Sequence, residues 1–126
     1  MQINCAKELT VYQKAYVLAM DVFRLSVRFP AEERFALVSQ IRRSTRSVCL
    51  NLREAWAKRR YEAHFISKLT DCDGEINETD SALDFAHDCG FITSDEHSRC
   101  VALGIEVRRM IGAMLKDPSP FLISQT

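Results

Sequence analysis

The sequence is poor in the residues that end and redirect helices. Four glycines and three prolines in 126 residues leave few turn signals. No segment shows the alternation of β-branched and polar residues that is typical of strands. Hydrophobic residues make up 47% of the chain, which is enough for one ordinary core without metals or disulfides. The composition therefore predicts a single all-α domain.

Long hydrophobic segments are also missing. No apolar run approaches the roughly 18 residues of a membrane span, and the first ten residues, MQINCAKELT, lack the basic-then-apolar layout of a signal peptide. The five cysteines are odd in number and include no C-x-x-C pair, which is typical of a reducing compartment rather than a disulfide framework. We therefore expect a cytoplasmic protein without a membrane segment, whose cysteines are small buried hydrophobes.

Motifs for catalysis and cofactor binding are scarce. The chain has no Gly-x-Ser-x-Gly elbow and its glycines are isolated, which argues against a nucleophilic triad and a phosphate-binding loop. Asp84 and His87 place a carboxylate and an imidazole one turn apart. A di-iron bundle, however, needs two Glu-x-x-His pairs and two further inward glutamates. We expect no enzyme activity, no metal and no cofactor.

The first half of the chain predicts two amphipathic helices. The first spans residues 6 to about 28, with Tyr12 in its apolar seam and Tyr16 and Phe23 widening that seam. Pro30 ends it and starts a second helix, because proline is tolerated in a first turn that needs no amide donor. The two glutamates that follow would lie at the positive end of this second helix, which continues to about residue 58.

The second half predicts two more helices. One has apolar positions between residues 65 and 86 and ends at Gly90, and the other is capped by Thr93 or Ser94 and ends before Pro118. Four amphipathic helices with short connections pack most readily as an antiparallel up-down-up-down four-helix bundle. We therefore expect an all-α bundle domain over residues 1–117 and a C-terminal tail over residues 118–126.

The second helix carries two interleaved seven-residue patterns. Its apolar seam stays on one side of the helix and consists of Val38, Ile41, Thr45, Val48, Leu52 and Ala55. A polar row beside this seam consists of Gln40, Ser44, Ser47, Asn51, Glu54 and Lys58. No histidine, cysteine or metal-ligand cluster shares its face, so Asn51 and Glu54 favour hydrogen bonding across a helix or subunit interface over general-base catalysis.

Gly74 is a further candidate for an interface. It lies mid-helix and roughly opposite the apolar seam, where alanine would be better by about 1 kcal/mol. An outward glycine is either neutral or a place where another backbone comes close. Together with the polar row, the second interpretation predicts self-association.

A basic stripe lies on the other flank of the second helix and consists of Arg42, Arg46, Arg53 and Arg60. Residues 31–60 hold eight basic and three acidic side chains, a net charge of +5, whereas residues 61–126 hold five basic and twelve acidic ones, a net charge of −7. Two interpretations remain open. The arginines pair with acidic side chains such as Asp71, Glu75 and Glu78 within or between subunits, or they bind a polyanion such as RNA or DNA.

Four segments together resemble a known family: LTVYQKA (9–15), FPAEERFALVSQIRRS (29–44), SVCLNLREA (47–55) and GEINE (74–78). They resemble the bacterial four-helix-bundle family encoded in intervening sequences of large-subunit ribosomal RNA genes, over about residues 9–115. The family usually has glycine where this chain has Ala55, and an aliphatic–serine pair where it has Glu75 and Ile76.

The resemblance implies an up-down-up-down bundle that assembles as a ring-like homopentamer and has no established catalytic activity. The chain is also similar in architecture to the accessory protein of diversity-generating retroelements, a basic pentamer that binds nucleic acid and a reverse transcriptase. We therefore expect a non-enzymatic, self-associating accessory factor that binds nucleic acid. The alternative is a protein-interaction scaffold without nucleic-acid binding.

Overall fold

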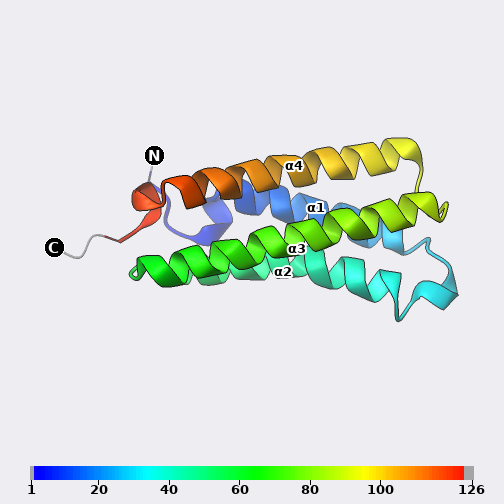
Figure 1. Cartoon of the computed structure of the whole chain (residues 1–126), viewed down its shortest axis with the longest axis horizontal. Coiled ribbons are helices and arrows are strands. Elements are labelled where there is room, and N and C mark those ends of the chain that lie inside the picture. The colour runs from blue at the N-terminus through cyan, green and yellow to red at the C-terminus, as the bar shows by residue number, and fades with distance from the viewer. Residues whose placement is uncertain (1, 124–126) are drawn as a thin grey trace.

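The described part of the computed structural model, residues 2–123, forms four long helices joined by short connections. They are α1 (Thr10–Ser26), α2 (Leu37–Ala57), α3 (Glu62–Asp88) and α4 (Ser94–Lys116). Three short 3-10 turns, η1 (Ala6–Glu8), η2 (Ala31–Glu33) and η3 (Ser119–Phe121), lie before α1, between α1 and α2, and after α4. Successive helices run in opposite directions (Figure 1), so the predicted all-α up-down-up-down bundle is confirmed.

The order of the helices around the bundle separates its charges. Both α1 and α3 pack against α2 and α4, so α1 and α3 lie on a diagonal. Helix α3 carries eight acidic residues and one lysine. Its carboxylates therefore lie close to α2 and α4, and α1 lies across the diagonal from them.

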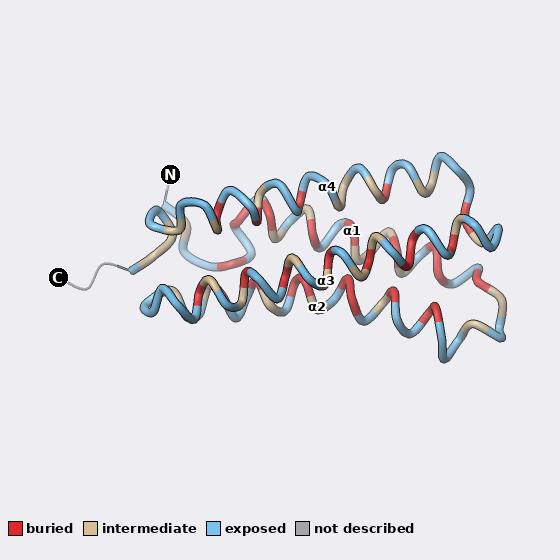
Figure 2. The backbone as a smooth tube through the Cα atoms, viewed as in Figure 1, coloured by how far each residue is buried: buried red, intermediate tan, exposed pale blue. Residues whose placement is uncertain are grey.

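The core follows the predicted apolar pattern. Buried positions recur along each helix on the side that faces its neighbours (Figure 2). In α2 all six seam residues are buried, as expected for side chains on one face of the helix. The most extensive contact joins α2 and α3.

The connection between α3 and α4 agrees with the sequence signals. Gly90 has a φ of 81°, and the amide of Phe91 donates to the carbonyl of Ala86 at 2.8 Å, which is the hydrogen bond of a Schellman cap. Thr93 then caps α4: its hydroxyl accepts from the Glu96 amide at 3.1 Å, and the Glu96 carboxylate accepts from the Thr93 amide at 2.9 Å. Both predicted boundaries are confirmed.

The predicted start of α2 at Pro30 is wrong, because α2 begins at Leu37. Residues 31–33 form a 3-10 turn in which no residue is buried, so no packing stabilises an α-helical continuation there. The Glu33 carboxylate accepts a hydrogen bond from the Leu37 amide at 3.3 Å and so satisfies one donor at the N-terminus of α2. Likewise α1 begins at Thr10 rather than residue 6, after the η1 turn and the extended Leu9.

The segment after α4 packs back onto the bundle. The ring of Phe121 stacks on that of Phe65 with 6.3 Å between their centres. The amide of Ile123 donates to the Arg59 carbonyl at 3.2 Å. Residues 124–126 of the expected tail lie outside the described residues. None of the described helices is long and apolar enough to span a membrane.

Candidate nucleic-acid interface

The arginine stripe of α2 lies along α1, where aromatic side chains contact it. Arg42 donates from Nε to Oγ of Ser26 at 2.7 Å, and its guanidinium carbon lies 4.7 Å from the centre of the Phe23 ring. The guanidinium carbon of Arg46 lies 5.9 Å from the same ring. These cation–π contacts position both side chains and leave their positive charge intact.

Arg53 makes equivalent contacts nearer the start of α1. Its Nε donates to the Tyr12 hydroxyl at 3.2 Å, and its guanidinium carbon lies 5.4 Å from the Tyr12 ring centre. Tyr12 in turn stacks on Tyr16, with ring centres 6.3 Å apart and planes inclined by 28°. An open depression of about 430 Å³ is lined here by Lys7, Tyr12, Gln13, Tyr16 and Arg53.

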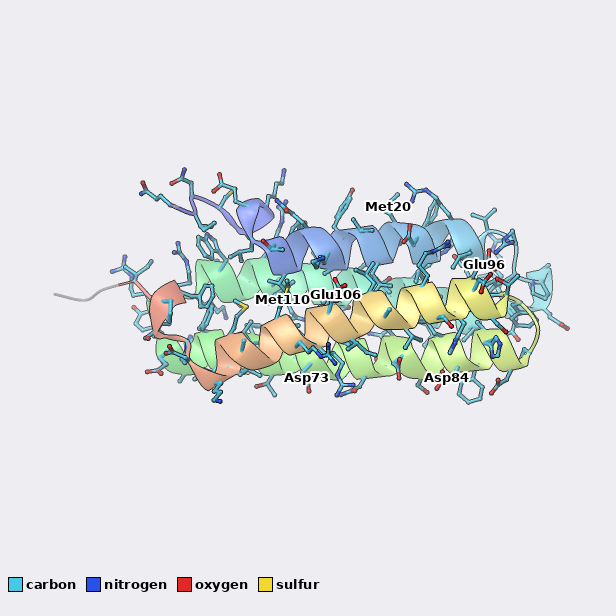
Figure 3. All side chains as sticks on the ribbon, turned by 90° about the horizontal axis from the view of Figure 1, so that it is seen from above. Met20, Asp73, Asp84, Glu96, Glu106 and Met110 are labelled. Atoms are coloured by element: carbon cyan, nitrogen blue, oxygen red, sulfur yellow. The ribbon has the colours of Figure 1, made fainter. Side chains whose placement is uncertain are left out.

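This flank of α2 forms no ion pair with the carboxylates of residues 2–123. No carboxylate oxygen of residues 2–123 lies within 4.0 Å of the side-chain nitrogens of Arg42, Arg46 or Arg53. Figure 3 shows Asp73 and Asp84 of α3 on the edge of the bundle opposite α1. The three arginines span about 17 Å of helix α2 at 1.5 Å per residue.

The predicted pairing of α2 with acidic residues of α3 involves a different arginine. Arg43 forms ion pairs with Glu75, at 3.4 Å, and with Glu78. The hydrogen bond from Arg43 holds the pKa of Glu78 below its usual range, and the same contact raises the pKa of Arg43. One residue earlier in the helix, Arg42 contacts Ser26 and Phe23 of α1 instead, because consecutive side chains are 100° apart.

Arg60 is not on the same helix as the other three arginines. Helix α2 ends at Ala57, and Arg60 lies exposed in the turn before α3. There it lines a surface depression with Tyr61 and His64. The structure therefore brings three of the four predicted arginines together and places the fourth beyond the end of the helix.

The polar row of α2 faces α3 of the same chain. Ser44 is fully buried and accepts a hydrogen bond from Thr79 at 2.9 Å, and Glu54 pairs with Lys68 at 2.7 Å. At the start of the row, the Gln40 side chain lies close enough to Glu78 of α3 to help lower the pKa of Glu78, after the larger effect of Arg43.

The side chains of Ser47 and Asn51 form no hydrogen bond to another helix among residues 2–123, and Gly74 lies on α3 itself. Asn51 is half-buried and donates to the carbonyl of Ser47 at 2.9 Å, which is a bond within α2. Gly74 is exposed, and a Cβ built on it would meet no atom within 4 Å. Its outward position leaves room for another chain.

The sequence predicts that the aromatic partners of these arginines lie in or beside the apolar seam of the first helix. Tyr16, expected to widen the apolar seam, exposes 53% of its surface. The feature of the sequence that could have indicated this aromatic surface is the spacing of Tyr12, Tyr16 and Phe23. It places the three rings within about 40° of one another on one face of α1. Their pairing with arginines depends on the register between α1 and α2.

Other titratable groups of the described residues form no second site. His97 contacts Asp84 at 2.8 Å, and the His87 ring lies against the His97 ring with 4.7 Å between centres. Within residues 2–123 no group of three or more histidine, cysteine, aspartate or glutamate side chains could hold a metal ion.

Fold and surface together define a class: a small helical bundle with an arginine–aromatic groove on one flank. The chain belongs to the 23S rRNA-intervening sequence protein family, whose model matches residues 7–113. A solved structure from Bacteroides thetaiotaomicron, described as a protein with unknown function from the S23 ribosomal protein family, has 27% sequence identity and a TM-score of 0.77. The alignment covers 84% of this chain and 95% of that one. No curated protein matches the chain.

Proposed function

We propose that the protein is a non-enzymatic accessory factor that binds RNA or DNA through the groove between α1 and α2. The observation that carries the proposal is the row of Arg42, Arg46 and Arg53, which has no carboxylate partner among residues 2–123. Guanidinium groups bind phosphates in bidentate geometry, and a row of them can follow a backbone. Arg60, exposed in the turn before α3, is a further candidate for contact with the ligand.

The aromatic contacts favour this use of the arginines. Phe23 and Tyr12 hold the guanidinium groups in place before a ligand arrives, so less side-chain entropy is lost on binding. A cation–π contact also leaves the outer N–H donors available to a phosphate. An ion pair with a carboxylate, as at Arg43, would occupy those donors.

The second part of the proposal is that the protein acts as a homo-oligomer, with a pentamer preferred. Gly74 and Phe85 lie within about 20° of each other on the outward side of α3. Phe85 exposes 62% of its surface, and Gly74 offers bare backbone about three turns earlier on the same side of the helix. An exposed aromatic ring and an open backbone on one face suit contact with a second copy. A ring of subunits would repeat the arginine row and raise avidity for one strand.

We also propose that the protein is cytoplasmic and that it binds a protein partner. The resemblance to retroelement accessory proteins indicates a reverse transcriptase as that partner. Five free thiols support a reducing compartment. The alternative function is a protein-interaction scaffold without nucleic-acid binding. Exposed apolar side chains favour it, above all Phe35, which exposes 87% of its surface, and Leu50, which exposes 60%.

Fluorescence anisotropy with labelled oligonucleotides at low salt tests the proposed function. Arg46→Glu combined with Arg53→Glu should abolish binding, because the groove loses two cations and gains two anions. The matched control is Arg99→Glu combined with Arg109→Glu, two exposed arginines of α4, which makes the same change in charge elsewhere. Absence of binding by the wild type, or equal loss in both double variants, would favour the scaffold.

A further inference from the structure

We propose that the depression at the Arg53 end of the groove binds an unpaired base of a single-stranded nucleic acid, with Tyr16 as the stacking platform. The inference rests on the proposed function and names the form of nucleic acid that the groove selects. Its basis is the set of side chains that line the depression. These side chains carry two positive charges and no negative one.

The Tyr16 ring is exposed and supported from behind. It exposes 53% of its surface and stacks on Tyr12 with 6.3 Å between ring centres. Tyr12 is itself held by Arg53, which donates to its hydroxyl at 3.2 Å and covers its ring. Contacts therefore run from Arg53 through Tyr12 to Tyr16, whose ring is exposed. A ring braced in this way loses little freedom when a planar group stacks on it.

Polar groups around Tyr16 match the other parts of a nucleotide. Lys7 on η1 and Arg53 on α2 each contribute a cation to the lining of the depression. Phosphates that flank a stacked base could contact these cations. Gln13 donates from its side-chain amide to the Lys7 carbonyl at 3.2 Å, and its amide oxygen can accept a hydrogen bond from a base N–H. The volume of about 430 Å³ falls within the usual range of small-molecule sites.

Single strands fit this arrangement better than duplexes. In a duplex the faces of the bases are stacked on one another, so no π-face is available to Tyr16. An unpaired base can stack on the ring while its backbone continues along Arg46 and Arg42. The arginine row supplies affinity for any phosphate backbone, and Tyr16 supplies the preference for unpaired bases.

Three variants isolate the stacking contribution. Tyr16→Ala should weaken binding of a labelled single-stranded oligonucleotide about 5- to 100-fold. Tyr16→Phe should bind as the wild type does, because it keeps the ring and loses only the hydroxyl. Phe35→Ala removes another exposed aromatic ring, in the connection before α2, and should have no effect. Affinity for a duplex of the same sequence should be unchanged in all three variants.

Two further measurements separate stacking from charge and from structure. The fluorescence of 2-aminopurine placed in the strand should be quenched on binding to the wild type and to Tyr16→Phe, but not on binding to Tyr16→Ala. Light scattering should give the same mass for wild type and Tyr16→Ala. Adenosine monophosphate should bind far more weakly than the strand, because it cannot reach Arg46 and Arg42.

The outcomes distinguish this inference from the proposed function. If the wild type binds neither strand nor duplex, the proposed function fails and this site fails with it. If the wild type binds but Tyr16→Ala binds single strands equally well, only the base-stacking site is wrong. Equal losses for strand and duplex, or a changed mass, would assign Tyr16 to folding or assembly instead. Binding of adenosine monophosphate as tight as that of the strand would indicate a nucleotide pocket and overturn the single-strand assignment.

Discussion

Thr79 of α3 donates a hydrogen bond from its hydroxyl to Oγ of Ser44 in α2 at 2.9 Å, and both side chains are buried. Two hydroxyl groups thus bridge the helix pair with the most extensive contact, inside an apolar interface. Each also has a backbone acceptor within its own helix, the Glu75 carbonyl for Thr79 and the Ile41 carbonyl for Ser44.

Ser44→Ala should lower the free energy of unfolding by about 0.5–1.5 kcal/mol, because one hydrogen bond between α2 and α3 is lost. The loss stays small since Thr79 keeps the Glu75 carbonyl as an acceptor. Ser44→Leu should cost more, about 1–3 kcal/mol, because the site has no room for a larger side chain. Urea denaturation measures both. Ser39→Ala, at an exposed site of the same helix, is the control, and a Ser44→Leu protein as stable as the wild type would contradict the buried contact.

Helix boundaries that carry their own capping signals could be predicted from the sequence, and those set by packing could not. Gly90 and Thr93 fix the connection from α3 to α4 by local hydrogen bonds, and the sequence predicts the glycine stop and a cap at Thr93 or Ser94. The start of α2 depends instead on where core contacts begin. Because residues 31–36 bury no side chain, the proline signal at Pro30 produced a 3-10 turn rather than the helix.

The candidate site shows the same division. Helical periodicity predicted that Arg42, Arg46 and Arg53 share a flank. It could not predict that this flank meets Tyr12 and Phe23, because the rotation and register of α1 against α2 are set by the whole core. A rotation of α2 by one residue would have given Arg42 the carboxylate partners that Arg43 has.

Gly74→Ala should stabilise an isolated subunit by about 1 kcal/mol, since alanine is the better helix former and a Cβ there meets no atom within 4 Å. Gly74→Trp should reduce the oligomer mass if another chain packs on this face of α3. Gly112, also helical and open, gives the matched Gly112→Trp control, which should keep the mass. Thermal melts and light scattering read out the two effects. A wild-type mass of 14.4 kDa, the mass of one chain, at micromolar concentration would contradict self-association.

The three buried thiols should resist modification in the folded protein. Burial raises the pKa of Cys72 to about 12 and those of Cys49 and Cys100 to about 11. Cys5 and Cys89 are exposed, so the expectation of buried cysteines is wrong for these two. At pH 8 a thiol reagent should therefore react quickly with two cysteines and with the other three only after unfolding. Rapid reaction of more than two would contradict the packing of the core.

The Arg43–Glu78 pair should contribute to acid sensitivity. The pKa of Glu78 is lowered in the folded protein, so the pair stabilises the fold above the pKa of the unfolded chain, about 4.3, and that stability is lost as pH falls through the folded value. Arg43→Gln should therefore reduce the drop in unfolding free energy between about pH 5 and pH 3, by under about 1 kcal/mol because the pair is partly exposed. Arg109→Gln is the surface control. An unchanged pH profile in Arg43→Gln would contradict the pair.

The salt dependence of nucleic-acid binding tests the central claim most directly. The logarithm of the dissociation constant for a labelled single strand is measured against the logarithm of salt concentration for wild type, Arg46→Gln and Arg109→Gln. If Arg46 contacts a phosphate, its loss should reduce the slope by about 0.7, since one fewer counterion is released, while Arg109→Gln should match the wild type. A slope that Arg46→Gln leaves unchanged, or no binding by the wild type at low salt, would contradict the assignment of the arginine groove to nucleic acid.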